Sequence, residues 1–138
     1  MAIELVVVTP SGEAWRGPVE SVVLPGTEGE FGVLPGHERF LCPLRTGEVE
    51  IRTPQGSVWA AISGGFADVS GSEVAVLAEA CEVAGDIDVA RAELAKQRAE
   101  QGLSQLDAGA ESDRDHYREF EAALERARTR LAVAQKAN

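Results

Sequence analysis

Hydrophobic positions in the first 84 residues fall into short runs that alternate with polar ones. β-Branched residues are frequent in these runs, and a turn signal rich in Gly, Pro or Ser arrives about every 8–12 residues. This spacing is typical of an antiparallel β-sandwich, and no helical pattern of useful length interrupts it. The runs occupy residues 3–9, 19–25, 48–53, 57–63, 66–70 and 74–80.

From Asp86 onward the hydrophobic period changes to that of a helix. Gly85 breaks the strand pattern, Asp86 is a good N-cap, and Asp88 falls in the first turn near the positive end of the helix dipole. The pattern therefore predicts a first helix that starts at about Asp86. Its apolar face would be formed by Ile87, Ala90, Leu94, Ala99, Leu103 and Leu106.

A second helix is predicted after a turn at residues 106–112. Ser112 and Asp115 have the spacing of a capping box. The apolar face beyond it comprises Tyr117, Phe120, Leu124, Ala127, Leu131 and Ala134. Two such narrow faces predict an antiparallel helical hairpin, and seams of alanine and leucine bury little area per residue. The hairpin is therefore either a movable element or a loosely packed tail.

These patterns predict an α+β chain, with a β-sandwich at residues 1–84 and a helix-turn-helix at residues 85–138. The net charge of −10 argues against nucleic acid and against direct docking on anionic lipid. No apolar run approaches the roughly 20 residues of a membrane span, so direct membrane insertion is not expected. The start of the chain lacks the basic region of a signal peptide, so we expect the protein to stay where it is made.

The charge is distributed unevenly along the chain. Residues 1–85 carry four arginines against twelve acidic residues, a net −8, whereas residues 86–138 carry nine basic residues against eleven acidic ones, a net −2. A basic helical face there is suited to an acidic partner. The alternative is a solvated helix with i,i+4 ion pairs.

The two cysteines and two histidines do not suggest a metal site. Cys42 and Cys81 have apolar neighbours and no second cysteine at CxxC spacing, so both are expected to be reduced core residues. Neither His37 nor His116 has ligands at zinc spacing. The sequence predicts no bound metal.

The segment 26–41 is too rich in glycine for a plain hairpin connection, and it carries charged residues that we expect to cluster at one exposed edge. A catalytic hypothesis makes His37 a base acting with Ser63 and Asp68, but no G-x-S-x-G motif accompanies it. A phosphate loop is also absent, since there is no G-K-[ST]. A binding edge is the better interpretation. Its polar residues are Glu28, Glu30, His37, Glu38 and Arg39.

Four segments resemble the epsilon subunit of the bacterial F-type ATP synthase. They are VVTPSGE at 7–13, GTEGEFGVLPGHERFL at 26–41, ISGGFADV at 62–69 and DIDVARAELAKQRAE at 86–100, with a weaker match in LERARTRLAVA at 124–134. They occur in the right order over essentially the whole chain. GEFGVLPGH and SGGF together are highly specific to that family.

The resemblance implies a sandwich of about ten strands followed by a helix-turn-helix. It also implies a non-catalytic rotor subunit that couples proton-driven rotation to ATP synthesis. Such a subunit binds the gamma subunit and the c-ring, and lies peripherally on the cytoplasmic face of the bacterial plasma membrane. Glu28, Glu30 and His37 match family positions that approach the c-ring loops and gamma.

In the resembled family the two helices can leave the sandwich and enter the alpha/beta catalytic head, where they hinder ATP hydrolysis. Their basic side chains face an acidic segment of the beta subunit. At the matching positions this chain has Arg114, Arg118 and Arg128, together with Arg126, Arg130 and Lys136.

Some bacterial members bind regulatory ATP through a motif Ile/Leu-Asp-x-x-Arg-Ala, while no cofactor is required. Here Ile87, Asp88, Arg91 and Ala92 match the motif, and further matching positions that line the site are Glu82, Arg98, Arg126 and Arg130. Guanidinium groups from two helices can fork onto phosphates. The alternative is a capped helix start with surface ion pairs. For the whole chain, the rival hypothesis is a free-standing acidic β-sandwich that binds a small ligand.

Overall fold

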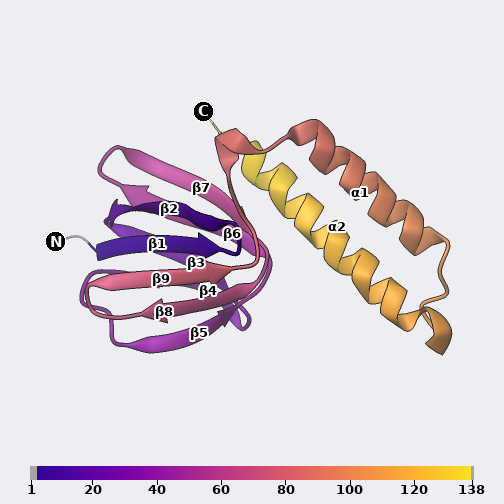
Figure 1. Cartoon of the computed structure of the whole chain (residues 1–138), viewed down its shortest axis with the longest axis horizontal. Helices are drawn as coiled ribbons and strands as arrows, with labels where there is room; N and C mark the ends of the chain where they lie inside the picture. The colour runs from indigo at the N-terminus through magenta and orange to yellow at the C-terminus, as the bar shows by residue number, and fades with distance from the viewer. Residues whose placement is uncertain (1–2, 138) are drawn as a thin grey trace.

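The N-terminal part of the chain is a folded sheet of ten strands (Figure 1). A computed structural model describes residues 3–137. The strands are β1 (Ile3–Thr9), β2 (Gly12–Val19), β3 (Ser21–Gly26), β4 (Gly29–Val33), β5 (Phe40–Leu44), β6 (Gly47–Thr53), β7 (Gly56–Ile62), β8 (Gly65–Val69), β9 (Glu73–Ala78) and β10 (Cys81–Val83). The predicted β-sandwich of about ten strands is thus confirmed.

The strands follow one hydrogen-bonded path, β10-β7-β6-β3-β5-β8-β9-β1-β2, with β4 paired to β3. At the bend between β3 and β5 the path depends on the single pairing of Gly26 with Leu44. The sheet therefore folds into two layers that remain joined at one corner. Between the layers lies a core of fully buried branched side chains, among them Leu5, Leu24 and Ile51.

The sheet differs from the sequence prediction in two ways. The strand β1 pairs with β9 in parallel, so the sandwich is not wholly antiparallel. Four strands, β2, β4, β5 and β10, were not visible as hydrophobic runs. Gly17 and Pro18 interrupt the hydrophobic pattern of β2. A proline is tolerated there because β2 is an edge strand, where the missing backbone N–H breaks no ladder on the open side. The glycine-rich segment also contains β4, which forms a tight hairpin with β3, so its glycine content does not exclude a hairpin connection, contrary to the expectation.

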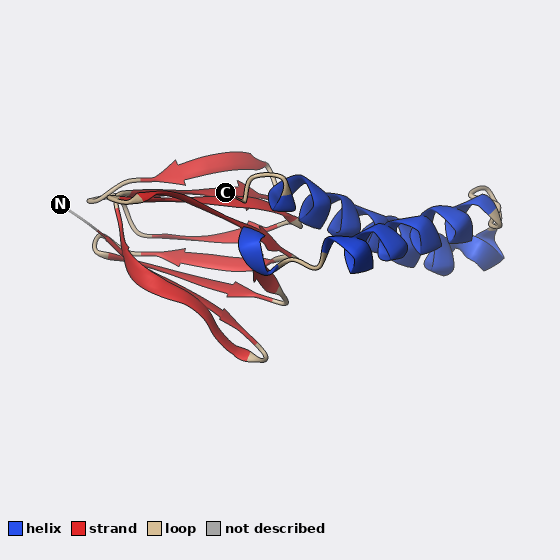
Figure 2. Cartoon of the chain, turned by 90° about the horizontal axis from the view of Figure 1, so that it is seen from above, coloured by secondary structure: helices blue, strands red, loops and turns tan. Residues whose placement is uncertain are grey.

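Two helices follow the last strand and project from one end of the sheet (Figure 2). A 3-10 turn, η1 (Ala84–Asp86), leads into α1 (Val89–Ser104), and a second, η2 (Glu111–Asp113), leads into α2 (Arg114–Ala134). The two helices form the expected antiparallel hairpin (Figure 1). None of the helices that the structure describes is long and apolar enough to cross a membrane.

The predicted start of the first helix was wrong by two residues, and that of the second helix by one. Asp86 belongs to the 3-10 turn, and Asp88 is the N-cap of α1, where its Oδ1 accepts from the backbone N–H of Arg91 at 3.1 Å. The expected capping box at Ser112 does not form. The N-cap of α2 is Asp113, whose carboxylate instead accepts from the backbone N–H of Asp107 at 3.0 Å.

The predicted apolar face of α1 is right only in part. Ala99 is buried as predicted, but Ala90 is exposed, Leu94 is 52% exposed, and Ala92, which was not on the predicted face, is buried. On α2 the prediction holds for Leu124 and Ala127, which are buried. At the far end of the seam, a Cβ on Gly102 would approach the ring of Phe120 to 2.5 Å, so the missing side chain makes room for that ring.

Candidate functional site at the junction of sheet and hairpin

A pocket of about 240 Å³ lies where the last strand, the linker and both helices meet. It is lined by Glu82, Asp86, Asp88, Arg91 and Arg130. Glu82 comes from β10, Asp86 and Asp88 from the linker, Arg91 from the first turn of α1, and Arg130 from α2. The structure thus brings together four of the residues expected to bind ATP and adds Asp86.

Local contacts orient these groups. The Nε of Arg130 lies 2.9 Å from Oε1 of Glu82, in an ion pair that joins α2 to the edge strand β10. The side chain of Arg130 is 28% exposed and that of Glu82 is 40% exposed, so this pair is only partly shielded from solvent. Asp88 caps α1 through the N–H of Arg91 and so fixes the start of that helix beside the pocket.

The pocket carries three carboxylates and two guanidinium groups. Guanidinium groups can bind phosphate oxygens bidentately, and carboxylates can accept from an exocyclic amine or a ribose hydroxyl. The net negative balance means that the whole of a triphosphate cannot lie among these five side chains without further cations. Phosphates therefore require arginines farther along the helices.

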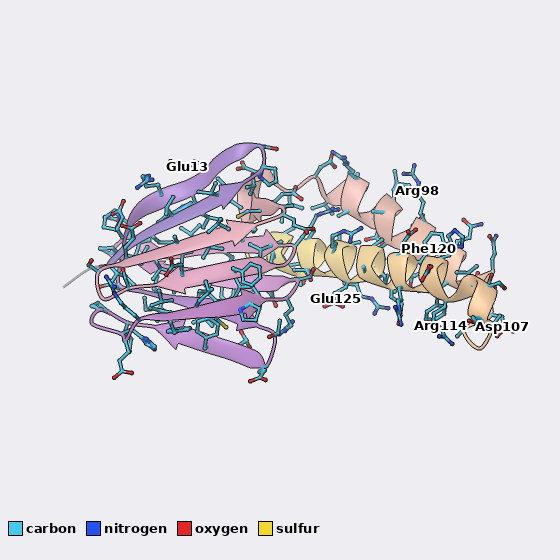
Figure 3. The ribbon with its side chains drawn as sticks, turned by 60° about the horizontal axis from the view of Figure 1, so that its bottom comes forward. Glu13, Arg98, Asp107, Arg114, Phe120 and Glu125 are labelled. Atoms are coloured by element: carbon cyan, nitrogen blue, oxygen red, sulfur yellow. The ribbon has the colours of Figure 1, made fainter. Side chains whose placement is uncertain are left out.

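The remaining expected ATP residues have other positions. Ile87 is buried in a junction core with Ala84 and Val133, and Ala92 is fully buried beside α2. Both have packing roles. Arg98 and Arg126 do not line the pocket. Arg126 is one turn before Arg130 on α2, whereas Arg98 is two turns after Arg91 and extends into solvent (Figure 3).

Glu28 and Glu30 lie at one end of the sheet and His37 at the other, so the expected cluster at one edge was wrong. Glu28 is in the β3–β4 turn and Glu30 is paired with Pro25. After β4, the backbone N–H of Gly36 donates to the carbonyl of Gly71 in the β8–β9 turn. His37 is half-buried against the ring of Phe40, with centroids 5.0 Å apart. The intervening strand β4 separates the two ends.

The same geometry contradicts the hydrolase hypothesis. Ser63 precedes β8, and its backbone N–H donates to Ala80. His37 is near the opposite end of β8, where Phe40 pairs with Val69. A nucleophile and its base must lie within hydrogen-bond reach, and these two side chains are separated by the length of a strand. Asp68 is therefore not part of a triad.

The basic residues of α2 fall into two groups. Arg114 and Arg118 lie exposed at the end of α2 that is distant from the sheet; Arg114 is marked in Figure 3. Arg128 is exposed near the sheet, where it borders grooves on two sides of α2. Lys136 follows α2 and contacts the sheet directly, through an ion pair with Glu48 and a position 3.8 Å from the ring centroid of Trp59.

An exposed apolar row that was not predicted from the sequence lies on the outer face of the layer that contains β5, β8, β9 and β1. Pro43, Phe66, Leu77 and Val8 are in register on the adjacent strands β5, β8, β9 and β1. Phe66 and Leu77 are 52% and 55% exposed. Two hydrophobic runs, at residues 5–8 and 74–78, are continuous where a half-solvated strand would alternate. That lack of alternation was the available signal.

The two cysteines are only half-buried, so the expectation that both are core residues was too strong. Cys81 packs against the main core from β10. Burial raises the pKa of its thiol to about 11, and the neighbouring carboxylate of Glu82 acts in the same direction. The thiol of Cys81 is therefore protonated and unreactive at neutral pH.

Comparisons with known proteins match both parts of the chain. Residues 2–84 match the family model of the ATP synthase delta/epsilon chain β-sandwich domain. Residues 86–135 match the model of the long α-helix domain of the same chains. Two family models therefore follow one another along nearly the whole sequence.

Relatives and solved structures agree with these matches. The ATP synthase epsilon chain of Syntrophobacter fumaroxidans is 46% identical over 97% of this chain and 96% of its own length. That of Halalkalibacterium halodurans is 41% identical over 93% of each chain. A chain in the structure of the Euglena gracilis mitochondrial ATP synthase, which is described as OSCP/F1/c-ring, has a TM-score of 0.78 at 28% identity, covering 97% of this chain and 81% of that one. The protein belongs to the ATP synthase delta/epsilon chain family.

Proposed function

We propose that this chain is the epsilon chain of an ATP synthase and acts as a non-catalytic subunit of its central stalk. In this function it couples proton-driven rotation to ATP synthesis. It lies peripherally, as part of the complex, on the cytoplasmic face of the bacterial plasma membrane. Support comes from the family membership and from relatives of nearly equal length.

The exposed apolar row is the proposed attachment surface for the gamma subunit. Contiguous exposed apolar side chains across four strands are costly in water and mark an interaction site. Of the polar contacts expected with gamma and the c-ring, Glu28 and Glu30 lie at one end of the sheet and His37 at the other. We therefore assign them to different neighbours.

The hairpin is the proposed inhibitor of ATP hydrolysis. Its seam is built largely of small residues, and its contacts with the sheet come from the last turns of α2. Such an element can exchange its packing for another surface at low cost. Released from the sheet, Arg114, Arg118 and Arg128 would face an acidic segment of the beta subunit in the catalytic head.

ATP is the proposed ligand that keeps the hairpin docked. The observation that carries this proposal is that one pocket is lined by side chains from the sheet, the linker and both helices: Glu82, Asp86, Asp88, Arg91 and Arg130. A ligand in it contacts the sheet, the linker and both helices at once, so it binds only the closed and docked form. Arg126, one turn from Arg130, and Arg98, farther along α1, are the proposed partners of the outer phosphates.

A thermal melt of the full chain with and without ATP tests this assignment. At a hundredfold excess over Kd, ATP stabilises the docked form by about 2.7 kcal/mol. Arg91→Ala should abolish the ATP-dependent rise in melting temperature, while Arg128→Ala, an exposed arginine outside the pocket, should keep it. If both variants lost the ATP-dependent rise in melting temperature equally, ATP would be attracted only by diffuse positive charge. If the parent chain showed no such rise, the motif at residues 87–92 would be only a capped helix start with surface ion pairs.

A further inference from the structure

The end of α2 packs on the outer face of the layer that contains β10, β7 and β6, at a site called the seat below. Glu82, Ala61 and Glu48 are in register on the neighbouring strands β10, β7 and β6. Ala61 is buried in the junction core, in which Val133 of α2 is fully buried. A small side chain flanked by two carboxylates therefore receives the apolar side of α2.

Each carboxylate of this row is paired with a cation from α2 or its end. Arg130 pairs with Glu82 on one side of the seat. Lys136 pairs with Glu48 on the other side, and its Nζ also lies over the ring of Trp59. The backbone N–H of Lys136 donates to the carbonyl of Val133 at 2.9 Å, which holds the lysine against the end of the helix.

The two pairs differ in their relation to the nucleotide pocket. Arg130 and Glu82 both line it, so a bound triphosphate competes with Glu82 for the guanidinium group. Lys136, Glu48 and Trp59 are not among the residues that line it. A ligand in the pocket therefore replaces the Arg130–Glu82 pair with its own contacts and leaves the Lys136–Glu48 pair intact.

We infer that Lys136, Glu48 and Trp59 form a latch that holds the hairpin on the sheet independently of nucleotide and sets its docked population when ATP is scarce. Only the consequence of the latch for ATP hydrolysis rests on the proposed function, in which release of the hairpin inhibits hydrolysis. The latch itself is a property of the isolated chain. Because an exposed ion pair is screened by salt, its strength decreases with ionic strength.

The test measures acrylamide quenching of Trp59 fluorescence in the full chain without ATP. The chain has two tryptophans, so a Trp15→Phe background leaves Trp59 as the reporter. Lys136→Gln should raise the undocked population about fivefold and increase quenching of Trp59. Glu48→Gln should act in the same direction. In the parent, raising NaCl from about 0.05 M to about 0.5 M should also increase quenching, and Lys136→Gln should remove most of that dependence.

Lys96→Gln is the matched control, because Lys96 is the only other lysine and lies on α1. It should leave Trp59 quenching unchanged. Unchanged quenching in Lys136→Gln, or an equal increase in Lys96→Gln, would overturn the latch. If the quenching results confirm the latch but the chain has no effect on ATP hydrolysis, the latch stands and the proposed inhibition is refuted. The two proposals therefore fail in different measurements.

Discussion

The sandwich and the hairpin differ in the size of the side chains that they bury. The sandwich core consists of fully buried Leu, Ile and Val side chains supplied by both layers of the sheet. The hairpin seam buries Ala92, Ala99 and Ala127, with Leu124 as its large buried side chain. Because stabilisation scales with buried apolar area, packing holds the sandwich together more strongly than it holds the hairpin.

The same contrast applies to how the two bodies meet. Their junction is a small apolar contact around Val133, flanked by the ion pairs Arg130–Glu82 and Lys136–Glu48. Charged contacts at a partly exposed junction contribute little net free energy and respond to salt and ligands. The strong packing thus lies within the sandwich, and the weaker contacts lie at the junction that the proposed release of the hairpin would have to break.

The largest expected effect compares one substitution in both regions. Leu5→Ala removes a fully buried side chain from the sheet and should cost about 3–4 kcal/mol of unfolding free energy. Leu124→Ala makes the same change in the seam and should leave unfolding of the sandwich nearly unchanged while reducing helix protection. Urea unfolding followed by Trp fluorescence and by helical circular dichroism separates the two. Equal losses of sandwich stability would contradict a detachable hairpin.

A second substitution tests the exposed apolar row. Phe66→Glu should weaken association with the gamma subunit by about 2 kcal/mol or more, since buried aromatic anchors dominate interfaces. The melting temperature of the isolated chain should change little, because Phe66 is 52% exposed. Leu94→Glu, on α1 and also 52% exposed, is the control. Co-purification with gamma that survives Phe66→Glu would exclude this face.

Removing the hairpin after Ala84 sharpens the comparison further. The truncated chain should fold, because the main core includes no residue from the helices. It should also raise the ATPase activity of the reconstituted catalytic head, since the proposed inhibitor is gone. A circular dichroism melt and a hydrolysis assay check the two outcomes. Unchanged hydrolysis would remove the regulatory role of the hairpin.

The smallest expected effect depends on pH. Burial raises the pKa of the Cys81 thiol from 9.0 to about 11, so the folded chain holds that proton more tightly than the unfolded chain. The corresponding stabilisation is fully present below about pH 9 and is lost as the pH rises through 11. Cys81→Ala should flatten this part of the stability profile in urea unfolding at several pH values. An identical profile in parent and variant would show that the thiol does not titrate differently on folding.

The sequence was informative where a local pattern is sufficient. Alternation revealed six strands, and the change of period placed the hairpin after residue 85. It failed where local signals compete: Asp86 and Asp88 are both good caps, and the 3-10 turn that decides between them has no strong sequence signature. It failed again at Leu94, because in short amphipathic helices several faces carry alanine and leucine, and contacts with α2 select one of them.

The site was predictable in part for a similar reason. Asp88 and Arg91 are neighbours on one helix turn, so their proximity is local. Their meeting with Arg130 depends on how α2 packs, which only the family resemblance anticipated. The separation of Glu30 from His37 depends on β4, a strand hidden among glycines. The row Glu82–Ala61–Glu48 depends on the register of three strands and has no sequence signal at all.

Hydrogen exchange of the full chain with and without ATP tests most directly the claim that ATP closes and docks the hairpin. At a hundredfold excess over Kd, exchange through opening of α1 and α2 should slow by about a hundredfold. Exchange in the central strands β3 and β9 should not change, because these strands do not line the pocket. Arg91→Ala should remove the slowing. Equal protection of strands and helices, or no protection of the helices at saturating ATP, would contradict a nucleotide-controlled hairpin.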